Sequence, residues 1–238
     1  MPRPLRPIDD GLIYHVINRG NNRQDVFRKQ GDFQAFLETL DELKKRKPFE
    51  LYGYCLLSNH FHLLIRPTGV SISRILQSLL VSHTQRYHRH YKSGGHVWQG
   101  RFKSPVIQDD EHLLTVLRYI EANPLRANVV RRADDYRWSS YRSHGAGAVD
   151  ERLDRLVTFD ELSNYPAVRQ RRWAKLVHRQ IDEDVLRQVR ASASSGLPFG
   201  SPIWVRRLAD RLGLDLEIRP RGRPRKVPGA ASQTVTNK

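Results

Sequence analysis

The sequence predicts an α+β protein in which helices cover one face of a sheet of four or five strands. Strand-like and helix-like segments alternate over residues 1–145, which is typical of this class. With 238 residues, of which 39% are hydrophobic, the chain is long enough for one domain of ordinary size and a smaller appendage. We therefore expect a main domain over residues 1–145, a small helical appendage over 146–216 and a disordered basic tail over 217–238.

The first predicted elements are a strand and an amphipathic helix. Residues 12–18 are rich in β-branched and aromatic side chains and precede the turn-prone segment Arg19–Asn22. The helix begins near Asp32, which suits the N-cap position, and it ends before Pro48. Its apolar residues recur at helical spacing: Phe33, Phe36, Leu37, Leu40 and Leu43.

The middle of the main domain predicts a hairpin followed by a long helix. The strand-like runs 49–57 and 60–66 are separated by the polar pair Ser58–Asn59, so we expect the two strands to pair. The segment 71–91 has apolar residues at helical spacing, and two glycines follow it, which favours a helix end there.

The second half of the chain carries weaker signals. Residues 97–107 can form another strand, and residues 110–123 predict a third helix that Pro124 stops. Further helical stretches are predicted at 167–189 and 201–212. The remaining C-terminal residues are rich in Pro and Arg and then in small side chains, a composition that cannot bury a core.

The charge of the chain favours an anionic polymer as its partner. Its 41 Lys and Arg residues outnumber 25 Asp and Glu residues, giving a formal net charge of +16 and a pI near 10.4. No apolar run approaches the length of a membrane span, so nucleic acid is the expected partner and a membrane is not. The single cysteine, Cys55, and the lack of an apolar signal region after Met1 predict a cytoplasmic protein.

Two histidines form the first candidate site. His60 and His62 are two residues apart on a predicted strand, so both side chains leave the same face and can reach one metal ion. Phe61 leaves the opposite face and can anchor the strand in the core. The pattern by itself more often marks two histidines on a solvated sheet face.

A tyrosine provides a candidate nucleophile for the same site. Tyr119 lies roughly 150° round its predicted helix from the apolar stripe, so we do not expect it in the core. Asn123 follows one turn later on nearly the same side. A tyrosine hydroxyl is a poor nucleophile unless it or its target is activated, and a metal held by His60, His62 and a third ligand such as Asn123 can polarise a phosphate. A surface aromatic is the alternative for Tyr119.

Several segments together resemble the REP-associated tyrosine transposases, which are members of the HUH (His, hydrophobic residue, His) class of single-strand nucleases. The resemblance covers roughly residues 12–145, with the motifs in matching order and spacing. The matching segments are 14–20 (YHVINRG), 58–63 (SNHFHL), 98–102 (WQGRF), 119–127 (YIEANPLRA) and 138–141 (WSSY).

The resemblance implies a fold, a reaction and a substrate. It implies a ferredoxin-like antiparallel sheet with the histidines on a central strand, making residues 1–145 an HUH-type catalytic domain. It implies that Tyr119 attacks single-stranded DNA, leaving a 5′-phosphotyrosine and a free 3′-OH, and that a palindromic repeat hairpin is the substrate. It also implies a divalent ion, Mg²⁺ or Mn²⁺, held by His60, His62 and Asn123. No nucleotide cofactor is expected, since no phosphate-binding loop motif is present.

Some assignments stay open at this stage. Asn123 can instead hydrogen-bond the phosphate or cap the helix before Pro124, and imidazole ligands suit manganese better than magnesium. His15 can support the histidine pair from a neighbouring strand or can be an ordinary sheet-face histidine, so we leave it out of the metal set. The sequence does not distinguish a monomer from a dimer.

Candidate DNA contacts are basic and aromatic residues in loops and at strand ends, because backbone charge and base stacking hold single strands. In the main domain they are Arg19, Arg23, Trp98, Arg101 and Lys103, with Phe102 as a further aromatic. Packing accounts for Trp98 and Phe102 about as well. In the tail, Arg221 and Arg223 lie in a segment that resembles a minor-groove AT-hook, although a solvated cationic tail explains them equally. DNA binding would place the protein with the nucleoid.

Two other functions fit parts of the same pattern. A DNA-binding or regulatory protein without catalysis accounts for the charge and the basic tail. A zinc hydrolase that activates water accounts for the histidine pair and would cut without a protein–DNA adduct.

Overall fold

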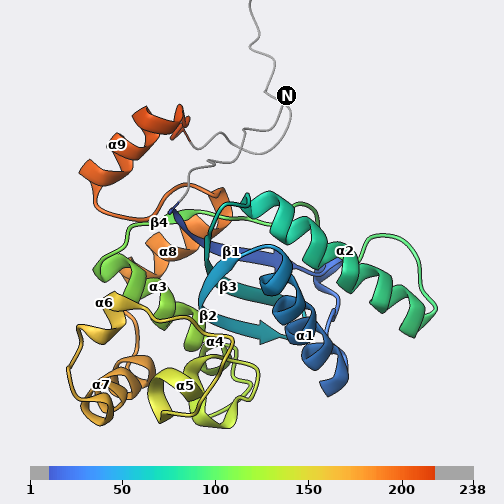
Figure 1. Ribbon diagram of the computed structural model, residues 1–238, viewed down its shortest axis with the longest axis horizontal. Coiled ribbons are helices and arrows are strands. Elements are labelled where there is room, and N and C mark those ends of the chain that lie inside the picture. Colours follow the sequence, from blue (N-terminus) through green and yellow to red (C-terminus); the bar gives the residue numbers. More distant parts are fainter. Residues whose placement is uncertain (1–10, 218–238) are drawn as a thin grey trace, which may run out of the picture.

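The computed structural model describes residues 11–217, and its first half forms a β-α-β-β-α-β unit (Figure 1). The strands lie in the order β2-β3-β1-β4, and each neighbouring pair is antiparallel. This order of elements is the ferredoxin-like arrangement, so the predicted α+β class is confirmed. The elements are β1 (Ile13–Arg19), α1 (Gln30–Arg46), β2 (Phe49–Leu57), β3 (His60–Pro67), α2 (Ile72–Tyr91) and β4 (Val106–Ile107).

Helices pack on both faces of the sheet, where we expected them on one. Phe61 of β3 packs against Phe36 of α1, with ring centroids 5.0 Å apart, and α1 and α2 cover this face. The opposite face meets α3 (Glu111–Glu121), in line with its ring contact between Tyr119 and His62. The contact is close because Gly53 of β2 has no side chain: a Cβ there would lie 2.3 Å from Leu117 Cδ1.

The predicted strand 97–107 is mostly irregular. Only Val106 and Ile107 form a ladder with β1, although isolated bridges join Gly20 to Trp98 and Ile17 to Lys103. Between those bridges Gly100 has φ +146°, which interrupts regular pairing. The segment therefore follows β1 as an irregular rim with only two residues of true strand.

The predicted helix 110–123 is also shorter than expected. α3 ends at Glu121, and a separate turn of helix, α4 (Asn123–Arg126), begins directly after Ala122. Pro124 does not stop a helix here but lies in the first turn of α4, where its missing N–H costs no hydrogen bond.

Three of the C-terminal helices pack against α3. Two helices occupy the predicted helical stretch 167–189, because Asp182 caps a new helix with its side chain. The helices are α5 (Tyr141–Ala146), α6 (Val157–Asp160), α7 (Pro166–His178), α8 (Glu183–Ser195) and α9 (Pro202–Leu212). Contacts of α6, α7 and α8 with α3 join this region to the sheet. Within residues 11–217, every helix is too short or too polar to span a bilayer.

Candidate active site

The histidine pair lies on the sheet face that α3 covers. His60 begins β3 and His62 follows it, with ring centroids 5.1 Å apart and ring planes nearly perpendicular. The Nδ1 atom of His62 lies 2.8 Å from Nε2 of His15, and Nδ1 of His60 lies 2.6 Å from Oδ1 of Asn59. Because each ring uses Nδ1 for these contacts, Nε2 is the nitrogen left to each ring for another ligand.

Burial keeps these imidazoles neutral at physiological pH. It lowers the pKa of His60 to about 4, with smaller effects of the Arg19 and Arg126 charges. Burial also holds the pKa of His62 well below its usual 6.5 and lowers that of His15 to about 3. A neutral imidazole has the lone pair that metal coordination requires.

Tyr119 lies directly over the histidines. Its ring centroid is 5.7 Å from that of His62 and 5.9 Å from that of His15, both edge-on. The side chain is only 8% exposed, so our expectation of a non-core position is wrong. The reason is that α3 is enclosed on several sides, by the sheet and by the C-terminal helices, whereas the helical period predicted a single buried stripe.

The Asn123 side chain bonds the end of α3, which is one of the roles that the sequence left open. Its amide nitrogen donates a hydrogen bond to the carbonyl oxygen of Tyr119 at 3.2 Å, and the side chain is buried. Among the described residues, no hydrogen bond joins Asn123 to His60 or His62. The bond to Tyr119 uses the amide nitrogen, whereas a metal would need the amide oxygen.

Two neighbours of the candidate site were not assigned to it from the sequence. The guanidinium of Arg126 lies over the Tyr119 ring, 4.1 Å from its centroid, and donates to the Tyr119 carbonyl oxygen at 2.7 Å. Its spacing of seven residues from Tyr119, two helical turns, was the available signal. Ile17 of β1 pairs with His62 of β3, so their side chains share one face of the sheet. His15, two residues before Ile17, lies on that same face and reaches His62.

Comparisons with known proteins bear on this geometry. Residues 10–123 match the family model described as Transposase IS200 like, a span that contains both histidines, Tyr119 and Asn123. A curated Haemophilus influenzae protein classed among the REP-associated tyrosine transposases is 30% identical over 106 residues. The resemblance to the REP-associated tyrosine transposases is confirmed. The match spans 40% of this chain and 60% of the length of that relative.

The fold agrees with a solved structure from the REP-associated tyrosine transposases. A structure of such a transposase bound to a REP hairpin aligns with a TM-score of 0.52 and 20% identity. The alignment covers 65% of this chain and 98% of that one.

The predicted DNA contacts of the main domain gather along one rim. The amide of Gln99 donates to the Arg19 carbonyl, and Ile17 exchanges backbone hydrogen bonds with Lys103, so the exposed Arg19, Arg101 and Lys103 lie on adjoining segments. Trp98 is half-buried against Phe61, which favours its packing role.

The remaining candidate DNA contacts also include both buried and exposed residues. Phe102 is buried and belongs to the core, whereas Arg23 is exposed. Arg221 and Arg223 lie outside the described residues.

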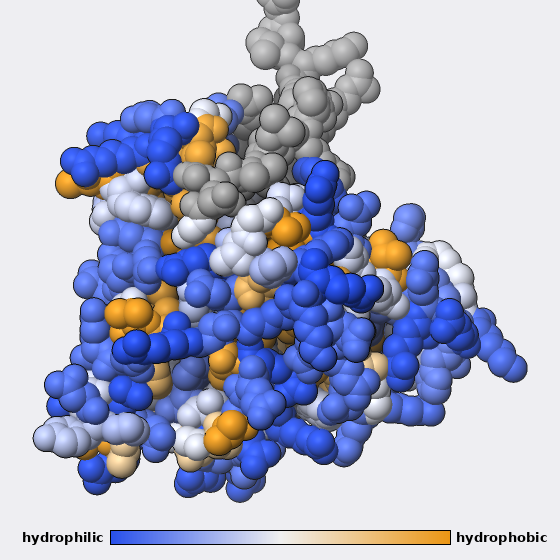
Figure 2. Space-filling model, viewed as in Figure 1, coloured by the Kyte–Doolittle hydropathy of each residue, from blue (hydrophilic) through white to orange (hydrophobic). Residues whose placement is uncertain are grey.

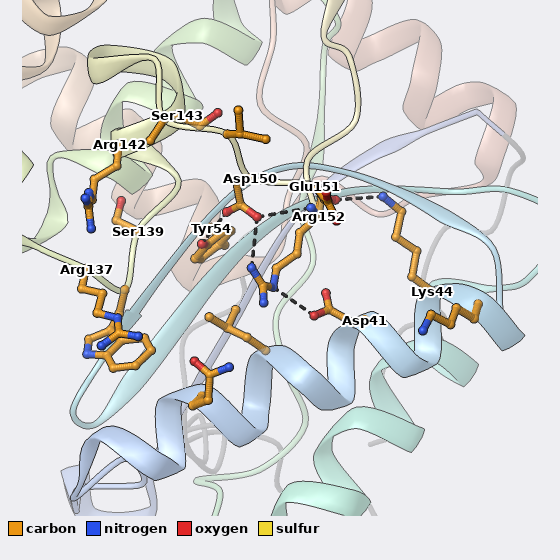
Figure 3. Close-up of a pocket in the computed structure, with 16 residues that line it drawn as sticks. Asp41, Lys44, Tyr54, Arg137, Ser139, Arg142, Ser143, Asp150, Glu151 and Arg152 are labelled. Carbon is orange, nitrogen blue, oxygen red and sulfur yellow. Dashed lines mark hydrogen bonds and ion pairs between the residues drawn. The ribbon is translucent and has the colours of Figure 1, made fainter.

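A cavity of about 890 Å³ lies away from this site (Figure 3). It is bordered by α1 and by the segment 137–152, and it contains none of the candidate site residues. Arg152 within it pairs with Asp41 and Asp150 at 3.1 Å. These three charges are therefore satisfied by one another.

Proposed function

We propose that this protein cuts and rejoins single-stranded DNA beside palindromic hairpins, with Tyr119 as the nucleophile. The observation that carries the proposal is the placement of Tyr119 against His62, with ring centroids 5.7 Å apart on the enclosed face of the sheet. A tyrosine held beside two neutral histidines is the arrangement that metal-assisted attack on a phosphate requires.

The residues present fit a divalent ion. His60 and His62 would hold it through Nε2, and the Asn123 amide oxygen would complete the set after its side chain turns. Among the described residues, no group of three or more His, Cys, Asp or Glu side chains could hold a metal ion, so the third ligand in this proposal is an amide. The ion would neutralise charge on the scissile phosphate. Mn²⁺ suits imidazole nitrogen better than Mg²⁺ does, so both ions belong in the test.

The covalent step exchanges one phosphodiester for another. The Tyr119 hydroxyl oxygen forms a bond to phosphorus, the bond from phosphorus to the 3′ oxygen breaks, and the phenolic proton is lost as the 3′ oxygen gains one. A 3′-OH attacking the phosphotyrosine reverses these steps and reseals a strand. Because the bond energy is retained, the reaction needs no nucleotide cofactor.

Hairpin DNA is the proposed substrate and partner. The related solved structure holds a REP hairpin, and the net charge of +16 supports binding to a polyanion. Arg19, Arg23, Arg101 and Lys103 would follow the single-stranded backbone, while Arg221 and Arg223 would add minor-groove or nonspecific contacts. A DNA substrate also implies a cytoplasmic, nucleoid-associated protein.

The test compares wild type with Tyr119→Phe on hairpin oligonucleotides that carry a single-stranded flank. With Mn²⁺ or Mg²⁺, wild type should give a covalent protein–DNA band on a denaturing gel, and Tyr119→Phe should give none. Hairpin affinity of the variant should stay within about threefold, a change worth less than 1 kcal/mol. Tyr165→Phe, at a tyrosine that is 73% exposed, is the matched control and should cleave normally.

Other outcomes of that gel identify the competing functions. Equal cleavage by Tyr119→Phe excludes Tyr119 as the nucleophile. Metal-independent binding without cleavage across hairpin substrates favours a regulatory DNA-binding protein. Cleavage without any adduct favours hydrolysis by activated water.

A further inference from the structure

We infer that Arg126 is a further catalytic residue, a cation that binds the scissile phosphate beside Tyr119. The inference rests on the proposed function and deepens it, because it assigns the group that receives the phosphate charge. It is drawn from the unfilled hydrogen-bonding capacity of this side chain and from the charges around it.

The Arg126 guanidinium has a buried donor without a partner. Its Nη2 atom donates to the Tyr119 carbonyl oxygen at 2.7 Å, which fixes the plane of the group over the Tyr119 ring. Its Nη1 atom is buried and has no hydrogen-bond partner within residues 11–217. A buried N–H donor without an acceptor costs stability. Arg66, Arg118 and Arg152 each have one such nitrogen too, at Nε. What distinguishes the Arg126 donor is its place beside the proposed nucleophile, where a ligand phosphate would complete it.

Arg126 also has no carboxylate partner in the described part of the chain. Burial weakens its protonated form, and Arg190 of α8 adds another positive charge nearby. Its charge reaches His15, His60 and His62, and Arg19 adds a second positive charge at His60 and His62. The candidate active site is therefore positive, and an incoming phosphate would supply the missing anion.

Other partly buried arginines show what a structural role looks like in this protein. Arg66 pairs with Glu50 and Asp109, and Arg152 pairs with Asp41 and Asp150. Arg118 on α3 lacks a carboxylate, but it donates to the carbonyl oxygens of residues 179 and 180. Among these side chains, Arg126 is the one that stacks on the proposed nucleophile.

The proposed contact serves the chemistry through charge and position. A guanidinium presents several N–H donors in a fixed plane and can hold two phosphate oxygens at once. Because Nη2 holds the backbone of Tyr119, the Nη1 contact would fix the phosphate relative to the attacking hydroxyl. Arg126 stays protonated throughout, so it transfers no proton and acts on the charge that develops on the phosphate.

The first test separates binding from adduct formation. Arg126→Met should lower the rate of adduct formation on the order of 10²–10³-fold, while hairpin affinity changes only a few-fold. Arg126→Lys should keep part of the rate, since it keeps the charge but loses the planar group. Arg118→Met is the matched control on the adjoining helix and should react like wild type. Rates for Arg126→Met equal to wild type would overturn the inference.

A second test distinguishes a phosphate contact from a purely positioning role. A methylphosphonate at the scissile position removes the charged oxygen, so the rate ratio of wild type to Arg126→Met should collapse toward one. A ratio that persists on the methylphosphonate would show that Arg126 only positions Tyr119 and would overturn the inference.

Rescue by guanidinium ion provides a third test, made on a variant that lacks the whole side chain. Added guanidinium ion should restore adduct formation in Arg126→Ala, because the small cation can occupy the same place, and failure of rescue in a folded variant counts against the phosphate contact. Absence of any adduct from wild type would instead overturn the proposed function, and the inference with it, so the two failures are distinguishable.

Discussion

At the scale of single residues, the candidate site combines neutral imidazoles with positive charges. His60 and His62 have their Nδ1 atoms engaged by Asn59 and His15, and burial keeps the rings unprotonated. A hydrogen bond to the second nitrogen fixes the tautomer and the orientation of a ligand histidine. His15 thus has the geometry of a positioning residue for His62.

This contact predicts the behaviour of His15 variants. His15→Leu should weaken Mn²⁺ binding and slow adduct formation by about 10–100-fold, because His62 loses the partner that orients it. His15→Gln should recover part of both, since its amide can still bond Nδ1 of His62. Mn²⁺ titration followed by electron paramagnetic resonance measures the first effect directly. Unchanged Mn²⁺ affinity in a folded His15→Leu protein would contradict this role.

Local patterns predicted some residues of the candidate site and did not predict others that the structure brings beside them. His60, His62 and Tyr119 were recognisable because a two-residue spacing and short motifs carry them. The contacts of His15 and Arg126 depend on strand register and on the turn after α3, which no local pattern encodes. The burial of Tyr119 was mispredicted for the same reason, because the helices that enclose it lie far along the chain.

At the scale of elements, α3 joins the sheet to the C-terminal helices. Glu121 at its end is fully buried and accepts hydrogen bonds from three side chains of two later segments. These donors are the Ser140 hydroxyl, His144 Nδ1 at 2.6 Å and Trp173 Nε1 at 2.7 Å. Residues of α5 and α7, together with Ser140, therefore hold the helix that carries Tyr119.

Replacing Glu121 should destabilise the protein. Glu121→Gln keeps the shape of the side chain but replaces one carboxylate oxygen with an amide NH₂ group. That group then faces another donor, either Trp173 Nε1 or the donors of Ser140 and His144. We expect the free energy of unfolding to fall by about 3 kcal/mol, the upper end of the cost of leaving a buried donor unsatisfied. Urea unfolding measures it, and Glu111→Gln, at an exposed residue of α3, should change stability by less than about 1 kcal/mol. Equal stability of Glu121→Gln and wild type would refute this assignment.

Element prediction succeeded where the pattern is local. The hairpin of β2 and β3 and the helices α1 and α2 follow from alternation, helical spacing and flanking turn residues. The prediction of a full strand over 97–107 failed because its pairing partner, β1, lies far earlier in the chain. Pro124 was ambiguous, since proline both ends one helix and suits the first turn of the next.

At the scale of the whole molecule, the surface fits a polyanionic partner. Figure 2 shows one face that is largely hydrophilic, with hydrophobic residues scattered over it rather than gathered in one patch. A net charge of +16 on such a surface favours electrostatic binding, which weakens steeply as salt rises.

Global stability should depend on pH through buried neutral histidines. Burial lowers the pKa of His83 from its usual 6.5 to about 4, and the side chain is 4% exposed. The unfolded chain binds this proton more readily than the folded chain does. The stability that neutral His83 contributes is therefore fully present above pH 6.5 and is lost as the pH falls toward 4. This one group should account for about 3 kcal/mol at about 1.4 kcal/mol per pKa unit.

The His83 prediction is tested by unfolding at several pH values. His83→Gln keeps a side-chain donor for the Val26 carbonyl oxygen, which His83 Nε2 contacts at 3.1 Å, but it cannot take up a proton. Its stability should fall less steeply than that of wild type between pH 6.5 and 4. His90→Gln, at an exposed histidine of the same helix, should keep the wild-type slope, and an identical slope for His83→Gln would contradict the prediction.

The central claim, that Tyr119 becomes covalently joined to DNA, is tested most directly by locating the bond. Wild-type protein is reacted with a hairpin oligonucleotide and Mn²⁺, digested with trypsin and nuclease, and examined by mass spectrometry. The account predicts that nucleotides are attached through a 5′-phosphate to the peptide Tyr119–Arg126, at Tyr119. Attachment to any other residue, or cleaved DNA with no linked peptide, would contradict it.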